Sequence, residues 1–231
     1  MRRMTIADNL KQVRERIAEA CKRSGRNVSE VAFVLVTKEV EVTRIQEAYE
    51  LGVRDFGENR VQQLVAKKSQ LAADIRWHMI GHLQTNKVKP VVGEVVLIHS
   101  LDRLSLAMEL QKQAEKQDRE IPVLAQVNFS AEETKSGFEP EEAEACLSQV
   151  IRSCNRLNFQ GLMTIGPNTR EEGPIRSSFS KLRELQGIMR KQFPQFDWHY
   201  LSMGMSLGFE IAVEEGANLL RIGTAIFGPR T

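Results

Sequence analysis

Apolar residues recur along the chain in two patterns. Apolar side chains at every third or fourth position from Ile6 to Cys21 predict an amphipathic helix from Met4 to Ser24. The continuous apolar run VAFVLVT, Val31 to Thr37, has the length of a strand and predicts burial on both faces. We expect the N-terminal helix, within residues 1–25, to pack against the domain that begins with this strand.

Strand and helix patterns alternate after this point, so that eight strands are expected in all. The strands end near Thr37, Asn59, Gly81, His99, Asn128, Ile165, Leu201 and Ile222, and the main helices between them span 43–51, 61–72, 104–116, 140–152, 175–190 and 207–215. Such alternation implies parallel strands joined by right-handed crossovers. Eight units in 231 residues favour one (β/α)8 TIM-like barrel domain over residues 1–231. No GxGxxG follows the first strand, which argues against a dinucleotide-binding fold.

Composition narrows the class of protein further. Lys and Arg number 32 against 30 Asp and Glu, so no strong field attracts nucleic acid or acidic membranes. The pairs Arg2-Arg3 and Lys67-Lys68 are expected on solvated faces. The three cysteines fit neither a disulfide framework nor a zinc motif, which predicts reduced thiols in a cytoplasmic protein. No signal-peptide core, membrane-length run or exposed apolar stripe is seen, and a monomer is expected.

Polar residues gather where the expected strands end, and in a barrel these ends converge on one face. They are Lys38, Asn59, His82, Asn128, Met163-Thr164, Ser202 to Ser206, and Arg221 with Gly223-Thr224. The set has no carboxylate pair for hydrolysis. His78 and His82 are four positions apart but straddle a strand end, so no metal site is predicted.

The stretch NLLRIGTAIF, Asn218 to Phe227, places a charge inside an apolar strand. Such a guanidinium needs a fixed partner, either a ligand or a core carboxylate such as Glu210. The Gly223-Thr224 step offers backbone N–H groups and a hydroxyl that suit a phosphate. The Ser202 to Ser206 stretch is a second small-residue loop of this kind, unless it is a structural turn. Two such loops after the last two strands match the phosphate site of TIM barrels.

An amine beside a phosphate site indicates a phosphorylated aldehyde as ligand. Pyridoxal 5′-phosphate (PLP) fits: Lys38 forms the imine, the loops hold the phosphate, and a side chain meets the pyridine nitrogen. Two alternatives stay open at this point. Lys38 is a solvated loop lysine, or the chain is a lyase or aldolase that forms an imine with a phosphorylated sugar.

Motifs spread over nearly the whole chain carry a family resemblance. They are VTK (36–38), FGEN (56–59), WHMIGHLQTNK (77–87), VN (127–128), KSGF (135–138), GLMTIGP (161–167), LSMGMS (201–206) and RIGTAIFGPR (221–230). With these motifs in this order, the chain resembles the YggS/PROSC family of PLP homeostasis proteins. That family has a fold type III PLP-binding barrel related to the N-terminal domain of alanine racemase.

The resemblance implies roles for ten residues. Lys38 carries the Schiff base, Ser206, Gly223 and Thr224 bind phosphate with Ser202 and Gly204 in the same loop, Arg221 faces the pyridine nitrogen, and Asn59, His82 and Met163 line the pocket. Three departures from the family pattern fall on the pocket rim. Arg60 replaces a frequent tyrosine, Leu207-Gly208 replaces an acidic residue, and Glu39 to Glu41 replaces a proline-containing stretch.

The resemblance also bears on activity. Because arginine keeps its proton, the pyridine nitrogen opposite Arg221 should stay unprotonated, which makes the ring a weak electron sink. The related racemases add a second domain and a catalytic tyrosine, whereas this chain ends at Thr231 and its two tyrosines, Tyr49 and Tyr200, lie at no expected strand tip. We therefore expect a non-catalytic protein that holds PLP and supplies or buffers it, in transient contact with apo-enzymes. The alternative is a PLP-dependent amino-acid racemase.

Overall fold

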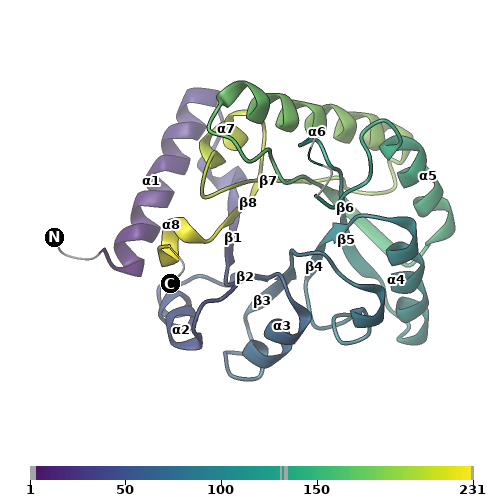
Figure 1. Ribbon diagram of the computed structural model, residues 1–231, viewed down its shortest axis with the longest axis horizontal. Helices are drawn as coiled ribbons and strands as arrows, with labels where there is room; N and C mark the ends of the chain where they lie inside the picture. Colours follow the sequence, from purple (N-terminus) through teal and green to yellow (C-terminus); the bar gives the residue numbers. More distant parts are fainter. Residues whose placement is uncertain (1–3, 131, 133–134, 230–231) are drawn as a thin grey trace.

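The computed structural model describes residues 4–130, 132 and 135–229, so Arg2, Arg3 and Arg230 lie outside the described residues. Within them, eight parallel strands close into a barrel, because β8 pairs with β1 (Figure 1). The strands are β1 (Ala32–Val36), β2 (Asp55–Glu58), β3 (Arg76–Met79), β4 (Leu97–Leu101), β5 (Ile121–Gln126), β6 (Leu157–Met163), β7 (Tyr200–Met205) and β8 (Leu219–Ile222). The expected (β/α)8 class is therefore confirmed.

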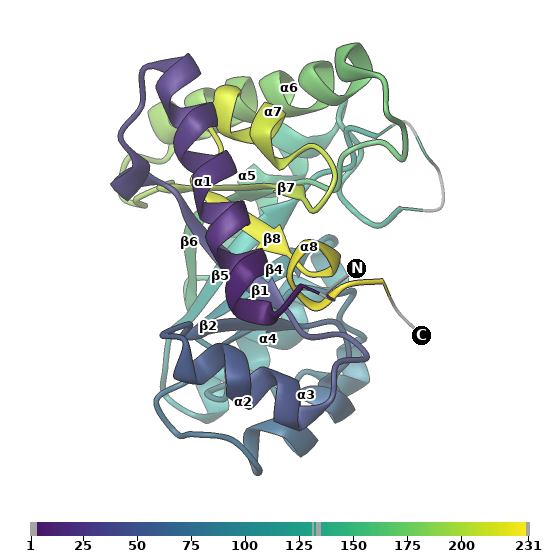
Figure 2. The same cartoon turned by 90° about the vertical axis from the view of Figure 1, so that its left-hand side faces the viewer.

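Helices surround the barrel (Figures 1 and 2). They are α1 (Ile6–Ser24), α2 (Val42–Glu50), α3 (Val61–Lys68), α4 (Leu104–Lys116), α5 (Ala143–Ser153), α6 (Glu172–Gln192), α7 (Phe209–Glu214) and α8 (Thr224–Phe227), with the 3-10 turns η1 (Val28–Glu30) and η2 (Thr85–Lys87). Between β3 and β4 the connection has η2 and turns in place of an α-helix.

The N-terminal helix α1 lies against α7 and α8, the helices that precede and follow β8 in the chain. It begins with a capping box at Thr5 and buries an apolar stripe against α7 and α8. Asn9 Nδ2 donates to the Ile226 carbonyl (2.7 Å), and Arg16 pairs with Glu210 on α7. The helix is thus tied to the segment that carries the last strand and the turn after it.

Several strand boundaries differ from the expected ones. The first residue of β1, Ala32, is exposed, so the strand is not buried along its whole length on both faces. The largest shift is in β7, which the sequence predicted to end at Leu201 but which continues to Met205. The prediction of a loop from Ser202 to Ser206 is wrong for its first four residues, because Ser202 and Met205 pair with β8. Only Ser206 lies beyond the strand.

Side chains that point inward fill the barrel in layers, as in other TIM barrels. One layer is apolar and consists of Val34, Leu97, Leu124, Met163 and Leu219. Other inward-facing residues are polar and include His78, His99, Ser202 and Arg221, all of them buried. The interior is therefore a packed core whose polar groups have to find partners inside it.

Candidate functional site

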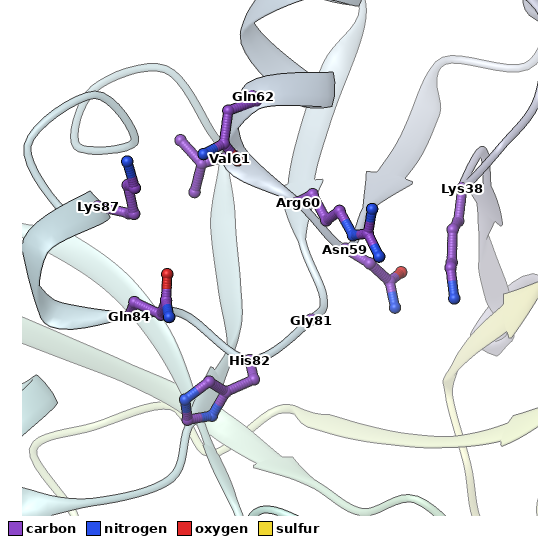
Figure 3. Close-up of a pocket in the computed structure, with 9 residues that line it drawn as sticks. All are labelled: Lys38, Asn59, Arg60, Val61, Gln62, Gly81, His82, Gln84 and Lys87. Carbon is purple, nitrogen blue, oxygen red and sulfur yellow. The ribbon is translucent and has the colours of Figure 1, made fainter.

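A cavity of about 420 Å³ opens at the ends of the first three strands (Figure 3). Its lining residues are Lys38, Asn59, Arg60, Val61, Gln62, Gly81, His82, Gln84 and Lys87. Three of the residues predicted for the site, Lys38, Asn59 and His82, therefore meet in one place. They come from the segments that follow β1, β2 and β3.

Lys38 occupies the second position of a tight turn. The Val40 amide donates to the Thr37 carbonyl (2.9 Å) across the turn, and Glu39 in its third position has a φ of 60°. A positive φ at a residue other than glycine is uncommon and is found at functional sites. The Lys38 side chain is 28% exposed and lines the cavity, with Nζ 4.0 Å from Glu39 Oε1. The turn thus presents the amine at the wall of the cavity.

A buried group of polar and charged residues, which we term the wall network (Thr37, Glu58 and Lys67), supports this turn. Lys67 Nζ donates to Glu58 Oε1 (2.6 Å) and to the Thr37 carbonyl (2.7 Å). Thr37 Oγ1 donates to the same carboxylate (2.7 Å), and the Asn59 amide donates to Glu58 Oε2 (3.2 Å). The network therefore fixes Thr37 and Glu58, the residues that directly precede Lys38 and Asn59 in the chain.

The expectation that Lys67 lies on a solvated face is wrong. Its side chain is only 11% exposed because α3 buries Val61, Leu64 and Lys67 at intervals of three residues. The neighbouring Lys68 does face solvent and pairs with Glu94. The spacing from Val61 and Leu64 is the signal in the sequence that could have identified Lys67.

Asn59 and Gly81, which both line the cavity, approach each other closely. A Cβ on Gly81 would lie 2.4 Å from the Asn59 carbonyl oxygen, so only glycine permits this approach of the two chain segments. Asn59 Oδ1 is buried and has no hydrogen-bond partner within the described part of the chain. An unpaired buried amide at a cavity wall is costly unless a ligand or water satisfies it.

His82 is oriented by two residues that the sequence analysis did not identify. Its Nδ1 lies 2.7 Å from Asp102 Oδ2 and 3.2 Å from Ser136 Oγ. Asp102 is buried directly after β4 and also pairs with Arg103. Because its Nδ1 is taken by the carboxylate, the imidazole has its Nε2 left for contacts in the cavity. The position of Asp102 at a strand end is the signal that could have revealed it.

Arg221 lies inside the barrel at β8, and its partners are neutral. Nη1 donates to Ser202 Oγ (2.7 Å), and Nη2 donates to the Thr164 carbonyl (2.8 Å). Burial lowers the pKa of Arg221 to about 10, so the guanidinium is still charged at neutral pH. The alternative of a core ion pair with Glu210 is wrong, since that carboxylate pairs with Arg16 on α1.

The turn after β8 is tied to the residue that follows β7. Ser206 Oγ accepts hydrogen bonds from the amides of Gly223 (3.2 Å) and Ala225 (3.1 Å). Thr224 is exposed beside them, and a Cβ on Gly223 would lie 3.2 Å from Val36 Cβ. The structure thus brings Ser206, Gly223 and Thr224 together next to β1.

Three further predicted residues, Met163, Ser202 and Gly204, also lie outside the lining of the 420 Å³ cavity. Met163 is fully buried in the apolar interior layer and does not line the 420 Å³ cavity. Ser202 is fully buried within β7, where its hydroxyl contacts Arg221. Gly204 has a φ of 87°, and a Cβ there would lie 2.5 Å from Ala212 Cβ, so packing against α7 requires the glycine. It lines a separate cavity of about 270 Å³ together with Lys135.

Lys135, a loop amine beside this second cavity, is largely shielded from solvent. Its Nζ donates to Glu132 Oε1 (2.6 Å) and to the Gly166 carbonyl (2.9 Å), and its side chain is 18% exposed. The hydrogen bond from Lys135 lowers the pKa of Glu132 below its usual value. The amine therefore holds two loops together.

Two further features bear on the class of site. Among the described residues, no group of three His, Cys, Asp or Glu side chains is placed to hold a metal ion. None of the helices formed by these residues is long and apolar enough to cross a membrane.

Known proteins resemble this chain over almost its whole length. The family model for the alanine racemase N-terminal domain matches residues 6–231. A pyridoxal phosphate homeostasis protein of Aquifex aeolicus is 44% identical over 228 residues, which cover 98% of this chain and 99% of the relative. A protein of the same name from Pseudomonas aeruginosa is 38% identical over 227 residues, which cover 98% and 96% of the two chains.

Solved structures give the same result. PipY of Synechococcus elongatus, in a structure with PLP bound, has a TM-score of 0.80 and 34% identity, and the match covers 94% of this chain and 100% of PipY. An alanine racemase of Clostridium difficile has a TM-score of 0.73 at 12% identity, which is a likeness of fold alone. The match covers 96% of this chain and 56% of that racemase.

The closed parallel barrel, with a lysine at the end of its first strand, places the chain in the class of alanine racemase N-terminal-domain barrels. Within this class, the chain belongs to the pyridoxal phosphate homeostasis protein family. The family resemblance that its motifs indicated is thereby confirmed.

Proposed function

We propose that this protein binds PLP through a Schiff base on Lys38 and serves PLP homeostasis by holding the cofactor and supplying or buffering it. The single observation that carries this proposal is the placement of Lys38 at the corner of a braced turn, with its amine at a cavity. PLP is an aldehyde, and a positioned lysine amine is the group that such cofactors require.

The residues around the amine fit the cofactor. Asn59 Oδ1 is buried without a partner among the described residues, as expected of a group that meets a ligand. Arg221 has five N–H donors, of which two are accounted for by Ser202 and Thr164. We assign the remaining donors to the pyridine side of PLP and assign Asn59 and His82 to the walls of the site. When bound, PLP would supply a reactive aldehyde and a conjugated ring.

The phosphate group is assigned to Ser206, Gly223 and Thr224. Two backbone amides already converge on Ser206 Oγ, and Thr224 adds a hydroxyl beside them. Backbone N–H groups and hydroxyls are common phosphate ligands. Ser202, Gly204 and Met163 are given indirect roles, since Ser202 contacts Arg221 and the other two shape the barrel.

A carrier function is favoured over a racemase by the positions of the two tyrosines. Tyr49 lies on α2 and donates to Asp74 Oδ1 (2.7 Å), and Tyr200 is the first residue of β7. Neither lines the cavity at Lys38. We therefore propose that racemisation is not the function. We also propose that the protein acts as a monomer and that apo-enzymes are transient recipients of PLP. The three free cysteines support a reducing compartment such as the cytoplasm.

Reconstitution with PLP tests the proposal. We expect the purified protein to gain a visible absorption band that borohydride removes, with a pyridoxyl adduct on Lys38 by mass spectrometry. Lys38→Ala should lose both signals, whereas Lys87→Ala, at the far end of the same cavity, should keep them. A wild-type protein that stays colourless, or an adduct on another residue, would refute the assignment.

Turnover separates the carrier from the racemase. L-amino acids are incubated with the PLP-loaded protein, and the enantiomers are then measured by chiral chromatography. A carrier should give less than one turnover per protein molecule over hours. Sustained conversion that Lys38→Ala abolishes would instead establish the racemase.

A further inference from the structure

A continuous row of hydrogen-bonded polar side chains runs through the barrel interior from Arg221 to Asp55. We term it the interior chain; its members are Asp55, His78, His99, Ser202 and Arg221. Successive members are 2.7 to 3.1 Å apart: Arg221 Nη1 to Ser202 Oγ, Ser202 Oγ to His99 Nδ1, His99 Nε2 to His78 Nδ1, and His78 Nε2 to Asp55 Oδ1. Asp55 and its partner Arg76 are the first residues of β2 and β3, so the row ends at the opposite side of the barrel from the cavity.

The donors and acceptors at the two ends determine the direction in which the hydrogen bonds run along the interior chain. Although burial alone raises it, the pKa of Asp55 is held at about 2 by hydrogen bonds from His78 and Arg76, so the carboxylate can only accept. His99 is fully buried, and burial, together with the charge of Arg221, keeps its pKa well below the usual value, so it is neutral with one N–H. One arrangement leaves no group unpaired: Arg221 donates to Ser202, which donates to His99, then His78, then Asp55.

This arrangement places a fixed acceptor at Arg221. The Ser202 hydroxyl is polarised because it donates its own proton to His99. Its hydrogen bond from the Arg221 cation is therefore stronger than one between neutral groups. The Ser202 hydroxyl and the Thr164 carbonyl thus hold the planar guanidinium of Arg221 at two points. A buried guanidinium held at both Nη atoms cannot rotate without losing a hydrogen bond.

We propose that Ser202 and His99 are positioning residues for Arg221, which fix its guanidinium so that the donors not used inside the barrel are available to the ring nitrogen of PLP. The proposal rests on the proposed function, because it takes PLP as the ligand. Ser202 and His99 act through Arg221 and touch the cofactor at no point. The interior chain thus holds Arg221 in place through hydrogen bonds that extend to the opposite end of the barrel.

Three substitutions test this proposal. Ser202→Ala removes the acceptor at Arg221, and His99→Leu removes the group that polarises it. His99→Asn keeps an oxygen near the position of Nδ1 and should rescue the contact with Ser202. Ser100→Ala is the matched control, because Ser100 is buried in the same strand as His99 and its hydroxyl has no hydrogen-bond partner among the described residues.

The first measurement uses the protein without PLP. Guanidinium NMR signals of Arg221, assigned by their loss in Arg221→Lys, should show separate, slowly exchanging Nη groups in the wild type and in Ser100→Ala. They should merge or broaden in Ser202→Ala and His99→Leu and be restored in His99→Asn. The second measurement is a PLP titration, in which Ser202→Ala and His99→Leu should bind about tenfold more weakly and show a shifted visible band.

The outcomes separate this inference from the function on which it rests. If folded Ser202→Ala keeps the wild-type guanidinium signals and the wild-type visible band, the positioning role is overturned while PLP binding stands. If the wild type binds no PLP, the proposed function fails, and the NMR signals still decide whether Ser202 and His99 hold Arg221. Should His99→Leu not fold, the comparison of Ser202→Ala with Ser100→Ala gives the same decision.

Discussion

Two buried polar networks flank the candidate site, and they differ in how their charges are arranged. In the wall network, Lys67 and Glu58 are in direct contact, and the fully buried carboxylate is also bound by Thr37. In the interior chain, the Arg221 guanidinium and the Asp55 carboxylate lie at opposite ends, separated by Ser202, His99 and His78. The charges of the wall network are therefore paired with each other, whereas Arg221 at the end of the interior chain has N–H donors that make no hydrogen bond within the described residues.

The difference indicates two separate tasks. The attraction within a buried ion pair offsets its desolvation only where the geometry is good and the hydrogen bonds are satisfied, and removal of one partner leaves an uncompensated charge. Such a network fixes the local backbone, here the turn that carries Lys38. A guanidinium with neutral partners retains its charge for a ligand, because no carboxylate neutralises it. We therefore expect substitutions in the wall network to affect mainly folding, and those near Arg221 to affect mainly PLP binding.

Lys67→Met should have the largest effect. It leaves the Glu58 carboxylate buried without its cation, and losses of about 3–5 kcal/mol in the free energy of unfolding are typical of such changes. Urea unfolding followed by circular dichroism measures this. The double variant Lys67→Met with Glu58→Met should recover much of the loss, since no lone charge remains. A single variant as stable as the wild type would show that the wall network does not determine folding.

Asp55→Asn should have the next largest effect, and its effect should depend on pH. The pKa of Asp55 is lowered from 3.8 to about 2, so the carboxylate stabilises the folded protein above its unfolded-state pKa and loses this contribution as the pH falls through about 2. The shift corresponds to about 2 kcal/mol at neutral pH. We expect the wild type to be more stable than the variant at pH 7, and this advantage to disappear between about pH 4 and pH 2.

The measurement is the free energy of unfolding from urea titrations at a series of pH values, with Asp197→Asn as an exposed control. A difference between wild type and Asp55→Asn that is constant over this pH range would contradict the pKa assignment. It would also show that the charge of Asp55, at the end of the interior chain far from the cavity, does not contribute to the free energy of unfolding.

Arg221→Lys tests the other side of the comparison. An ammonium keeps the charge but cannot make the two-point contact with Ser202 and Thr164 that the planar guanidinium makes. We expect PLP affinity to fall about tenfold, or about 1.4 kcal/mol, while the free energy of unfolding changes by less than in Lys67→Met. The measurements are a PLP titration by absorbance and urea unfolding. If stability falls as far as in Lys67→Met and affinity is unchanged, the two networks do not differ as inferred.

The architecture could be predicted from the sequence because its signal is local. Apolar runs of strand length alternate with helical periodicity, and α4 begins and ends at the residues expected, Leu104 and Lys116. The end of β7 could not be predicted, since Ser202, Gly204 and Ser206 have the composition of a loop. Pairing with β8 and packing of Gly204 against α7 keep this segment extended, and neither is visible in local sequence.

The candidate site was predictable where a polar residue lies at an expected strand end, as with Lys38 after the apolar run of β1 and Asn59 directly after β2. It was less predictable where function depends on contacts between distant strands. His99 and Asp55 carry no motif, and only the closed barrel brings them into one row with Arg221. Lys67 was misassigned because adjacent lysines resemble a solvated face, while its partner Glu58 lies in a different element.

The smallest effect is expected for Lys68→Met, next to Lys67 on the same helix. Lys68 Nζ lies 2.8 Å from Glu94 Oε2 in a pair whose side chains are 36% and 50% exposed. Exposed pairs contribute about 0–1 kcal/mol, and methionine has nearly the helix propensity of lysine, so the free energy of unfolding should change by less than about 1 kcal/mol. The urea experiment used for Lys67→Met measures both variants under the same conditions. A loss from Lys68→Met as large as that from Lys67→Met would mean that charge on α3, and not burial of the wall network, stabilises this part of the barrel.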